Sequence, residues 1–314
     1  MYSRLMNFIT FSVAFALQCI TTMANSAFAN DTPILVNAFN SNDNVRIISA
    51  GGSMTELLFA MGMQNSIVAV DTSSSFPKEV QDLPKVGYYR QLGTEGLLSL
   101  KPTHLFAAKG VGPRAVVDQL RAMGVEVAIF EQNRSVEGLT HLISELGHYL
   151  NKTKEAEALV NKLARDIAAL PQLEANIRLA FLMSVNERGI TAAGSNTVPN
   201  LLLELLGLEN PFISLDGFKP VSSEALIASA TQQVFMPAHQ TRGLSPQELC
   251  ELPALANWAQ LQGCNVHIVD SLLYLGLTPR LADAASDMAT KAQLPLSRTH
   301  NASSSLSVAT TAQP

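Results

Sequence analysis

The sequence predicts an α/β protein with two Rossmann-like lobes, mostly parallel sheets, a single long spine helix that joins the lobes, and a ligand cleft between them. Three observations predict this fold. Short β-branched segments alternate with amphipathic helical segments in both halves, a charged helical stretch separates the halves, and one turn-and-helix pattern occurs twice. A chain of 314 residues with 47% hydrophobic content can bury the cores of two such units.

The first half alternates strand and helix in the manner of a parallel sheet. We expect strands at residues 45–49, 66–70, 104–108 and 125–130, and helices at residues 53–63, 94–100 and 113–123. Ser53 and Glu56 have the spacing of a capping box, in which each side chain hydrogen-bonds the backbone N–H of the other residue. The first helix should therefore begin at Ser53.

A helical region at residues 136–170, broken near residues 151–153, precedes a second alternating half. There we expect strands at residues 179–184, 234–236 and 266–269, and helices at residues 200–206 and 279–291. These elements divide the chain into a signal peptide (1–29), an N-terminal lobe (30–134), a helical region that includes the spine helix (135–172), a C-terminal lobe (173–295) and a disordered tail (296–314).

An internal repeat supports the two-lobed plan. The segment 49–53, Ser-Ala-Gly-Gly-Ser, resembles the segment 191–195, Thr-Ala-Ala-Gly-Ser, and each precedes a leucine-containing helix. Further on, Thr-Glu-Gly-Leu around Glu95 resembles Ser-Glu-Ala-Leu around Glu224. Each lobe should therefore have a glycine turn into a helix and, later, a carboxylate at a helix start.

Residues 1–29 have the pattern of a secretory signal peptide. Arg4 precedes an apolar stretch at residues 8–20, and the small Ala27 and Ala29 suit a signal peptidase. The stretch is shorter than the roughly 20 residues of a bilayer span, so we expect a soluble protein in the periplasm. The alternative is a lipoprotein anchored through Cys19, which Gln18 disfavours because a small residue normally precedes such a cysteine.

Net charge, cysteine content and the absence of catalytic motifs limit the classes of function that the sequence allows. Removal of residues 1–29 takes away Arg4 and no acidic residue, so the net charge changes from −5 to −6 and nucleic acid is not an expected partner. Cys250 and Cys264 then remain in an oxidising compartment, where either a disulfide or two buried thiols fit the sequence. The chain has no Gly-x-Ser-x-Gly elbow, His-Glu-x-x-His or Walker motif, so we do not expect an enzyme.

Several segments resemble the periplasmic haem-binding proteins of bacterial haem ABC importers, within the helical-backbone, two-lobed (class III) periplasmic binding proteins. The most specific is Lys-Val-Gly-Tyr-Tyr-Arg at residues 85–90. The others are residues 46–56, 70–73, 95–102, 193–194, 217–220, 223–226 and 278–280. The resemblance covers nearly the whole mature chain and implies a monomer that captures haem b (hemin) and delivers it to an inner-membrane ABC permease dimer for iron uptake.

The resemblance also implies roles for individual residues. Tyr88 would be the axial ligand to the haem iron, because a phenolate is an oxygen donor suited to ferric iron. Arg90 would stabilise the phenolate or a haem propionate. Tyr89 would form part of the cleft wall, although a loop could present either ring. Glu95 and Glu224 would engage arginines of the permease dimer.

Other candidates rest on their positions near turns and strand ends. Cations that could bind propionates are Arg90, Lys109, Lys219, Arg242 and Arg280, and further wall residues are Phe218 and Tyr274. Residues 184–189 lack the histidine that some haem carriers have there, so His239 is the best-placed alternative ligand. A ferric siderophore or cobalamin is the alternative ligand for the same fold, and a periplasmic haem-modifying enzyme is a further alternative.

Overall fold

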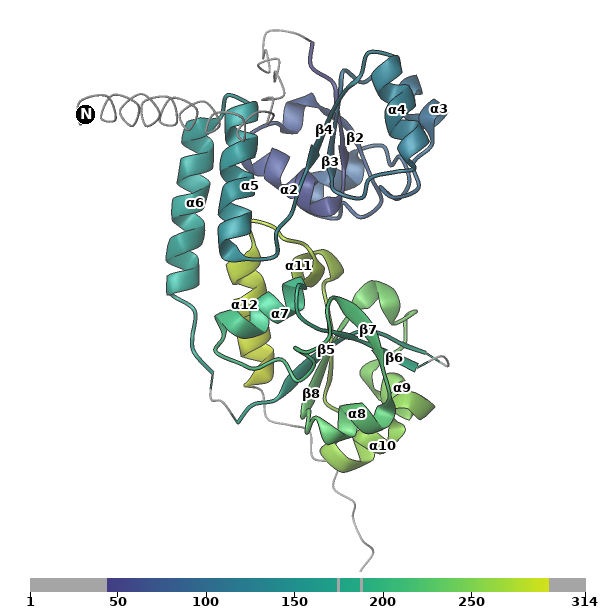
Figure 1. Ribbon diagram of the computed structural model, residues 1–314, viewed down its shortest axis with the longest axis vertical. Helices are drawn as coiled ribbons and strands as arrows, with labels where there is room; N and C mark the ends of the chain where they lie inside the picture. Colours follow the sequence, from purple (N-terminus) through teal and green to yellow (C-terminus); the bar gives the residue numbers. More distant parts are fainter. Residues whose placement is uncertain (1–43, 174–175, 187–188, 294–314) are drawn as a thin grey trace, which may run out of the picture. The chain divides into compact units, whose positions relative to one another are not determined.

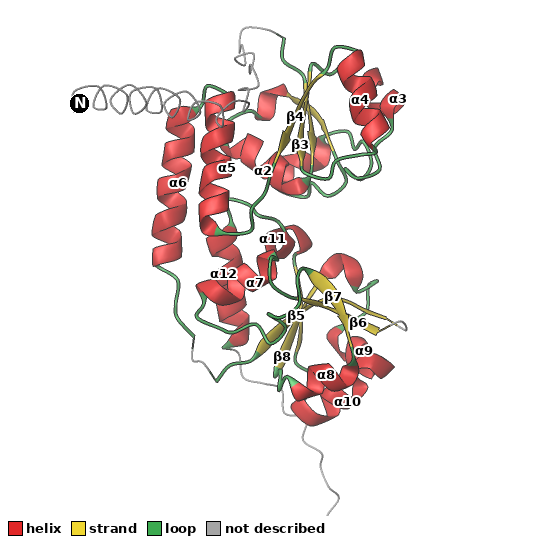
Figure 2. Cartoon of the chain, in the orientation of Figure 1, coloured by secondary structure: helices red, strands yellow, loops and turns green. Residues whose placement is uncertain are grey.

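The computed structural model describes residues 44–173, 176–186 and 189–293 (Figure 1). The expected signal peptide at residues 1–29 and the expected tail at residues 296–314 lie outside the described residues. Within the described part, helices and strands alternate along most of the chain (Figure 2). The α/β class predicted from the sequence is confirmed.

The first lobe is built on a four-stranded parallel sheet with the order β2-β1-β3-β4. Its strands are β1 (Ile47–Ala50), β2 (Ile67–Val70), β3 (His104–Ala108) and β4 (Glu126–Phe130). The connections contain helices α2 (Gly52–Ala60), α3 (Thr94–Ser99) and α4 (Arg114–Ala122) and the 3-10 turns η1 (Gln64–Ser66) and η2 (Lys78–Asp82). Because all four strands are parallel, the residues that follow them meet at one edge of the sheet.

Two packed helices follow the first lobe, α5 (Val136–Tyr149) and α6 (Thr153–Ala168). Asn151, with φ of 56°, reverses the chain between them at the break that the sequence predicts. Gly147 permits the close approach of α6, because a Cβ at this position would lie 2.3 Å from the Cβ of Ala156. The helical region is therefore a helix pair, and α6 is the spine helix that leads into the second lobe.

The second lobe is built on a five-stranded sheet with the order β7-β6-β5-β8-β9. Its strands are β5 (Leu179–Asn186), β6 (Gly189–Ala193), β7 (Phe218–Val221), β8 (Gln233–Pro237) and β9 (Val266–Val269). The sheet is mostly parallel, since β6 alone runs antiparallel to both of its neighbours.

The helices of the second lobe surround this sheet. They are α7 (Val198–Leu205), α8 (Ser223–Ala228), α9 (Pro246–Glu251), α10 (Pro253–Gln262), α11 (Ser271–Leu275) and α12 (Leu281–Ala292), with the 3-10 turn η3 (Ala238–Gln240). Cys250 of α9 and Cys264 before β9 form a disulfide with a Cα–Cα distance of 5.9 Å, within the usual range. Of the two alternatives for these cysteines, the structure has the bonded one.

Two local expectations from the sequence are wrong. The helix α2 begins at Gly52 after the N-cap Gly51 and has no side-chain cap, so Ser53 and Glu56 form no capping box. The strands expected in the second lobe also leave out β6, to which residues 191–193 belong. The Gly-Ile-Thr-Ala-Ala sequence of β6 gives little strand signal by itself, and pairing with both β5 and β7 stabilises it.

Trp258 on α10 is a buried residue of the hydrophobic core of the second lobe. This side chain is fully buried, and its Nε1–H donates a 2.8 Å hydrogen bond to the carbonyl oxygen of Thr231. We expect Trp258→Ala to lower the free energy of unfolding by about 3–5 kcal/mol, measured by urea denaturation. Leu261→Ala on the same helix is the control, because Leu261 is 65% exposed and its loss should change stability by about 0.5 kcal/mol or less. Equal losses in the two variants would contradict the burial of Trp258.

Candidate functional site

The tyrosine segment, residues 85–90, lies along the end of β2 at the edge where the parallel strands of the first lobe finish. Val86 N–H donates to the carbonyl oxygen of Val70 at 3.0 Å, and Val70 N–H donates to that of Pro84 at 3.0 Å. Thr72 N–H then donates to the carbonyl oxygen of Gly87 at 2.9 Å. The segment is thus attached to the sheet before it reaches Tyr88.

A buried carboxylate fixes the rest of the segment. Asp71 is fully buried, and its Oδ1 accepts hydrogen bonds from Gly51 N–H at 2.9 Å and the Ser74 hydroxyl at 2.8 Å. Its Oδ2 accepts from Ser73 N–H at 3.1 Å, the Ser73 hydroxyl at 2.7 Å and Tyr89 N–H at 3.2 Å. Five donors from three chain segments therefore satisfy one carboxylate, as a buried charge requires.

Lys85 has a structural role in the same loop. Its Nζ donates to the carbonyl oxygens of Ser74 at 2.9 Å and Val80 at 3.1 Å. Burial lowers the pKa of Lys85, while the negative charge of Asp71 acts in the opposite direction. The lysine of the Lys-Val-Gly-Tyr-Tyr-Arg motif thus closes the loop between β2 and the tyrosines.

Tyr88, Tyr89 and Arg90 form a compact cluster on a turn. Gln91 N–H donates to the Tyr88 carbonyl oxygen at 2.8 Å, which closes the turn. The two tyrosine rings meet edge to face with centroids 4.9 Å apart, and the Arg90 Cζ lies 4.9 Å from the Tyr89 ring centroid. Tyr88 is 43% exposed, so of the two rings it is the one turned toward the outside.

The electrostatics of the cluster distinguish the two tyrosines. Burial raises the pKa of Tyr89, and the charge of Arg90 only partly offsets this effect. Burial acts to lower the pKa of Arg90, but attraction to Tyr89 and hydrogen bonds with both tyrosines raise it overall. A permanent positive charge thus lies beside both phenols.

Arg90 is also held near the end of β3. A Cβ at Gly110, which has φ of +90°, would lie 2.9 Å from the Arg90 Nη1. Gly112 N–H donates to the Tyr89 carbonyl oxygen at 3.0 Å. The loop after β3 therefore accommodates the guanidinium and fixes the backbone beside Tyr88.

The remaining predicted cations differ in how far they are engaged. Lys109 pairs with Glu131 at 2.6 Å. Lys219 is exposed on β7 opposite Ala192 of β6, and Arg242 is exposed in a left-handed turn with φ of 56° after η3. Among the described residues, neither Lys219 nor Arg242 forms a hydrogen bond or ion pair with the tyrosine cluster, and both stay candidates.

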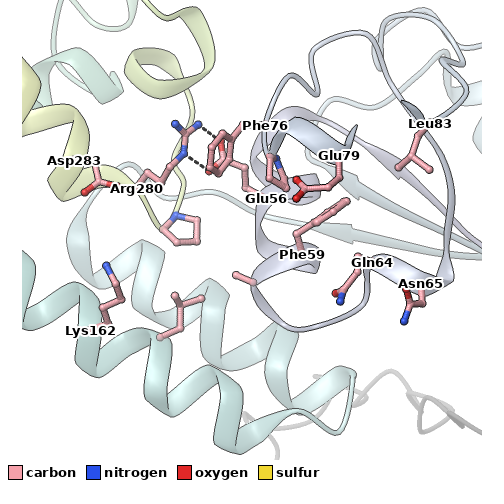
Figure 3. A pocket seen from close by; sticks show the side chains of 14 residues that line it. Glu56, Phe59, Gln64, Asn65, Phe76, Glu79, Leu83, Lys162, Arg280 and Asp283 are labelled. Carbon is pink, nitrogen blue, oxygen red and sulfur yellow. Dashed lines mark hydrogen bonds and ion pairs between the residues drawn. The ribbon is translucent and has the colours of Figure 1, made fainter. Parts of the chain in front are cut away.

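Arg280 is committed to a buried ion pair with Glu56. Its Nε and Nη2 donate to the two carboxylate oxygens of Glu56 at 2.8 and 2.5 Å, and its Cζ lies 3.7 Å from the ring centroid of Phe76 (Figure 3). The pair joins α2 of the first lobe to the segment before α12 and lines a cavity of about 700 Å³. Because Glu56 engages its guanidinium, we do not expect Arg280 to bind a propionate.

The predicted wall residues separate into one exposed and one buried aromatic. Phe218 is 37% exposed at the start of β7. Tyr274 is fully buried, and its hydroxyl donates to Asp287 at 2.7 Å, so the expectation that it lines a cleft is wrong. Its aromatic ring packs with Phe181 and Phe235 in the core of the second lobe. The sequence did not indicate this burial, because α11 is a single short helical turn.

His239 and the two predicted docking glutamates lie at exposed positions. His239 Nδ1 lies 2.7 Å from the Ser271 Oγ, and burial lowers the pKa of this imidazole. Glu95 is in the first turn of α3 and Glu224 in the first turn of α8. Among the described residues, no three His, Cys, Asp or Glu side chains form a metal-binding group.

The chain matches the family model described as "Periplasmic binding protein" over residues 47–270. This match spans most of the chain, so the chain belongs to the periplasmic binding protein family. It is the substrate-binding component of an ABC importer, which binds its ligand without transforming it and delivers it to the permease. None of the described helices combines the length and apolar composition that crossing a membrane requires.

Solved structures and curated relatives agree on this family and differ in ligand. The heme-binding protein HutB of Vibrio cholerae is 31% identical with a TM-score of 0.72, and covers 79% of this chain and 98% of its own. The heme-binding protein RhuT from Roseiflexus sp. RS-1 is 28% identical with a TM-score of 0.71, over 79% and 97%. The vitamin B12-binding protein of Vibrio vulnificus (strain YJ016) is 27% identical over 222 residues, 68% of this chain and 79% of its own.

Asp71→Asn tests the buried carboxylate. The amide keeps one acceptor oxygen but places an NH₂ group against donors that Asp71 satisfies, so we expect the free energy of unfolding to fall by about 2–3 kcal/mol. Urea denaturation measures this change. Asp118→Asn on the exposed face of α4 is the matched control and should change stability by about 0.5 kcal/mol or less. A loss as small as that of the control would show that Asp71 does not anchor the segment.

Glu56 should make stability depend on pH. Burial raises the pKa of Glu56 above its ordinary value of 4.5, although Arg280 opposes this shift. Between the two values the folded protein binds the proton more readily than the unfolded chain, so its stability should fall as the pH rises through the folded-state pKa. The measurement is the unfolding free energy of wild type minus that of Glu56→Gln at a series of pH values above 4.5. A difference that grows with pH would contradict the raised pKa.

Proposed function

We propose that this protein captures one ferric haem (haem b, hemin) in the periplasm and delivers it to an inner-membrane ABC permease. The observation that carries the proposal is the cluster of Tyr88 and Arg90 at the strand-end edge of the first lobe. The exposed phenol of Tyr88 is the iron ligand, and the guanidinium of Arg90 places a positive charge beside the oxygen that binds the iron.

The neighbouring tyrosine is less suited to the role of ligand. Tyr89 is held by its backbone on both sides, through Asp71 and Gly112, and its ring packs against Arg90. The raised pKa of its phenol disfavours the phenolate that ferric iron prefers. Tyr89 therefore supports Tyr88 and forms part of the wall beside the haem.

The remaining predicted residues complete the proposed transport cycle. Lys219 and Arg242 supply positive charge from the second lobe, residues 173–295, toward the ligand held by the first lobe, residues 30–134. The helical region at residues 135–172 links the two lobes. Glu95 and Glu224, each in the first turn of a short helix, dock on the permease, whose opening of the lobes releases the haem. A signal peptide at residues 1–29 directs the chain to the periplasm.

Similarity to known proteins supports haem and leaves cobalamin as the second candidate. HutB and RhuT, which resemble this chain at 31% and 28% identity, are heme-binding proteins. The curated relatives at 24% and 27% identity are vitamin B12-binding proteins. Cobalamin brings its own cobalt ligands, so an exposed tyrosine beside a fixed arginine favours haem.

A hemin titration tests the proposal. We expect a Soret band that shifts on binding and saturates at one haem per protein, and an affinity at least about 10-fold lower in Tyr88→Phe, because the iron loses its ligand. Tyr89→Phe is the matched control and should keep the shifted band.

Cyanocobalamin, titrated by calorimetry into the same protein, should bind more weakly than hemin. Absence of a Soret shift at micromolar hemin would reject haem as the ligand. Tight cyanocobalamin binding that Tyr88→Phe leaves unchanged would favour the second candidate.

A further inference from the structure

A polar pocket lies beyond the end of β4. It has a volume of about 540 Å³, and every residue that lines it carries a polar or charged side chain. Its lining residues are Gln132, Asn133, Arg134, Ser135, Asn196 and Asp216. The first four follow β4 in the first lobe, and the other two lie next to β6 and β7 in the second lobe.

Sheet topology places this pocket next to the tyrosine cluster. β4 is hydrogen-bonded to β3, and Lys109 N–H at the end of β3 donates to the Phe130 carbonyl oxygen at the end of β4, at 3.0 Å. Adjacent strands lie about 4.8 Å apart. Arg90 lies against Gly110, which follows β3. The residues that follow β4 are therefore one strand further along the same edge of the sheet. We expect a planar ligand bound at Tyr88 to extend toward them.

The first-lobe wall of the pocket favours an anion. Arg134 is exposed, and no carboxylate of the described residues lies within salt-bridge distance of it. Lys109, which follows the neighbouring strand β3, is already paired with Glu131. The N-terminus of α5, a helix of 14 residues, opens at Ser135, whose Oγ accepts from Gly138 N–H at 2.9 Å. The helix dipole adds to the positive potential.

Gln132 also indicates that the pocket binds a ligand with a hydrogen-bond acceptor. Its Nε2 is buried and has no hydrogen-bond acceptor among the described residues, although its side chain lines the pocket. Buried amide groups are normally hydrogen-bonded. Rotation of this side chain toward the pocket would give the N–H an acceptor on a bound ligand.

The second-lobe wall limits the charge that the pocket can accept. Asp216 is the one acidic residue that lines it, and its Oδ1 accepts from the Asn196 Nδ2 at 2.7 Å. The pocket lining thus has one guanidinium, of Arg134, and one carboxylate, of Asp216. This charge balance suits a single carboxylate group of a ligand better than a group with several negative charges.

We infer that Arg134, assisted by Gln132 and the N-terminus of α5, binds one carboxylate of the transported ligand. This inference rests on the proposed haem function, in which that group is a haem propionate. The pocket then selects for an acidic porphyrin and against a macrocycle whose side chains are neutral.

Hemin and hemin dimethyl ester, in which both propionates are methylated, provide the test. In the wild type we expect the ester to bind about 10-fold more weakly, the effect of one charge-assisted contact. Arg134→Gln should weaken hemin binding by a similar factor and leave the affinity for the ester unchanged within about twofold. Soret titrations measure all four affinities, and Arg134→Lys, which keeps the positive charge, should restore part of the preference for hemin.

Arg121→Gln is the matched control. Arg121 lies in the last turn of α4 and is half exposed, outside the residues that line the pocket, so its loss should not change the preference for hemin over the ester. Equal weakening of hemin and ester by Arg134→Gln would overturn the inference, as would no weakening at all. A Soret shift that depends on Tyr88 would in those cases leave the haem function standing, whereas no shift in the wild type would overturn both.

Discussion

The hydrogen bonds to the Asp71 carboxylate are the interaction on which the candidate site depends. Asp71 follows β2, and its oxygens join the turn before α2, the loop at residues 73–74 and the tyrosine segment. A buried carboxylate without these donors would be strongly destabilising, so the three segments stabilise the charge and the charge fixes the segments. Tyr88 is thereby positioned by the sheet even though it lies on a turn.

Glu56 and Arg280 impose a second constraint at a different place. Their ion pair connects α2 with the segment before α12, and the Phe76 ring covers the guanidinium. α2 begins at the turn that Asp71 binds, so one short helix carries the site's anchor near one end and a contact to the second lobe near its middle. The Glu56–Arg280 ion pair and the Asp71 hydrogen bonds therefore meet on one helix.

Much of the fold follows from sequence periodicity, and the failures have physical causes. The strand expected at residues 104–108 matches β3, because a short apolar run, residues 105–108, lies between Pro102 and Gly110. The small residues of β6 and the Phe-Lys-Pro-Val of β7 lack that signal, and only their pairing in the sheet makes them strands. The spacing of Ser53 and Glu56 suggests a helix cap, but Glu56 instead forms an ion pair with Arg280. This partner is 224 residues away, so the local sequence gives no sign of it.

The site was predictable where its residues are close in sequence and not where they meet through the fold. Tyr88 and Arg90 share one motif, so their proximity could be expected from six residues. Lys85 belongs to the same motif, yet its bonds to the carbonyl oxygens of Ser74 and Val80 depend on how the loop folds back. Asp71 has a local sign, an aspartate between a strand and a run of hydroxyl residues, but its bond to Tyr89 spans 18 positions. The motif thus identifies a candidate ligand, and the loop preceding it fixes the backbone that carries this side chain.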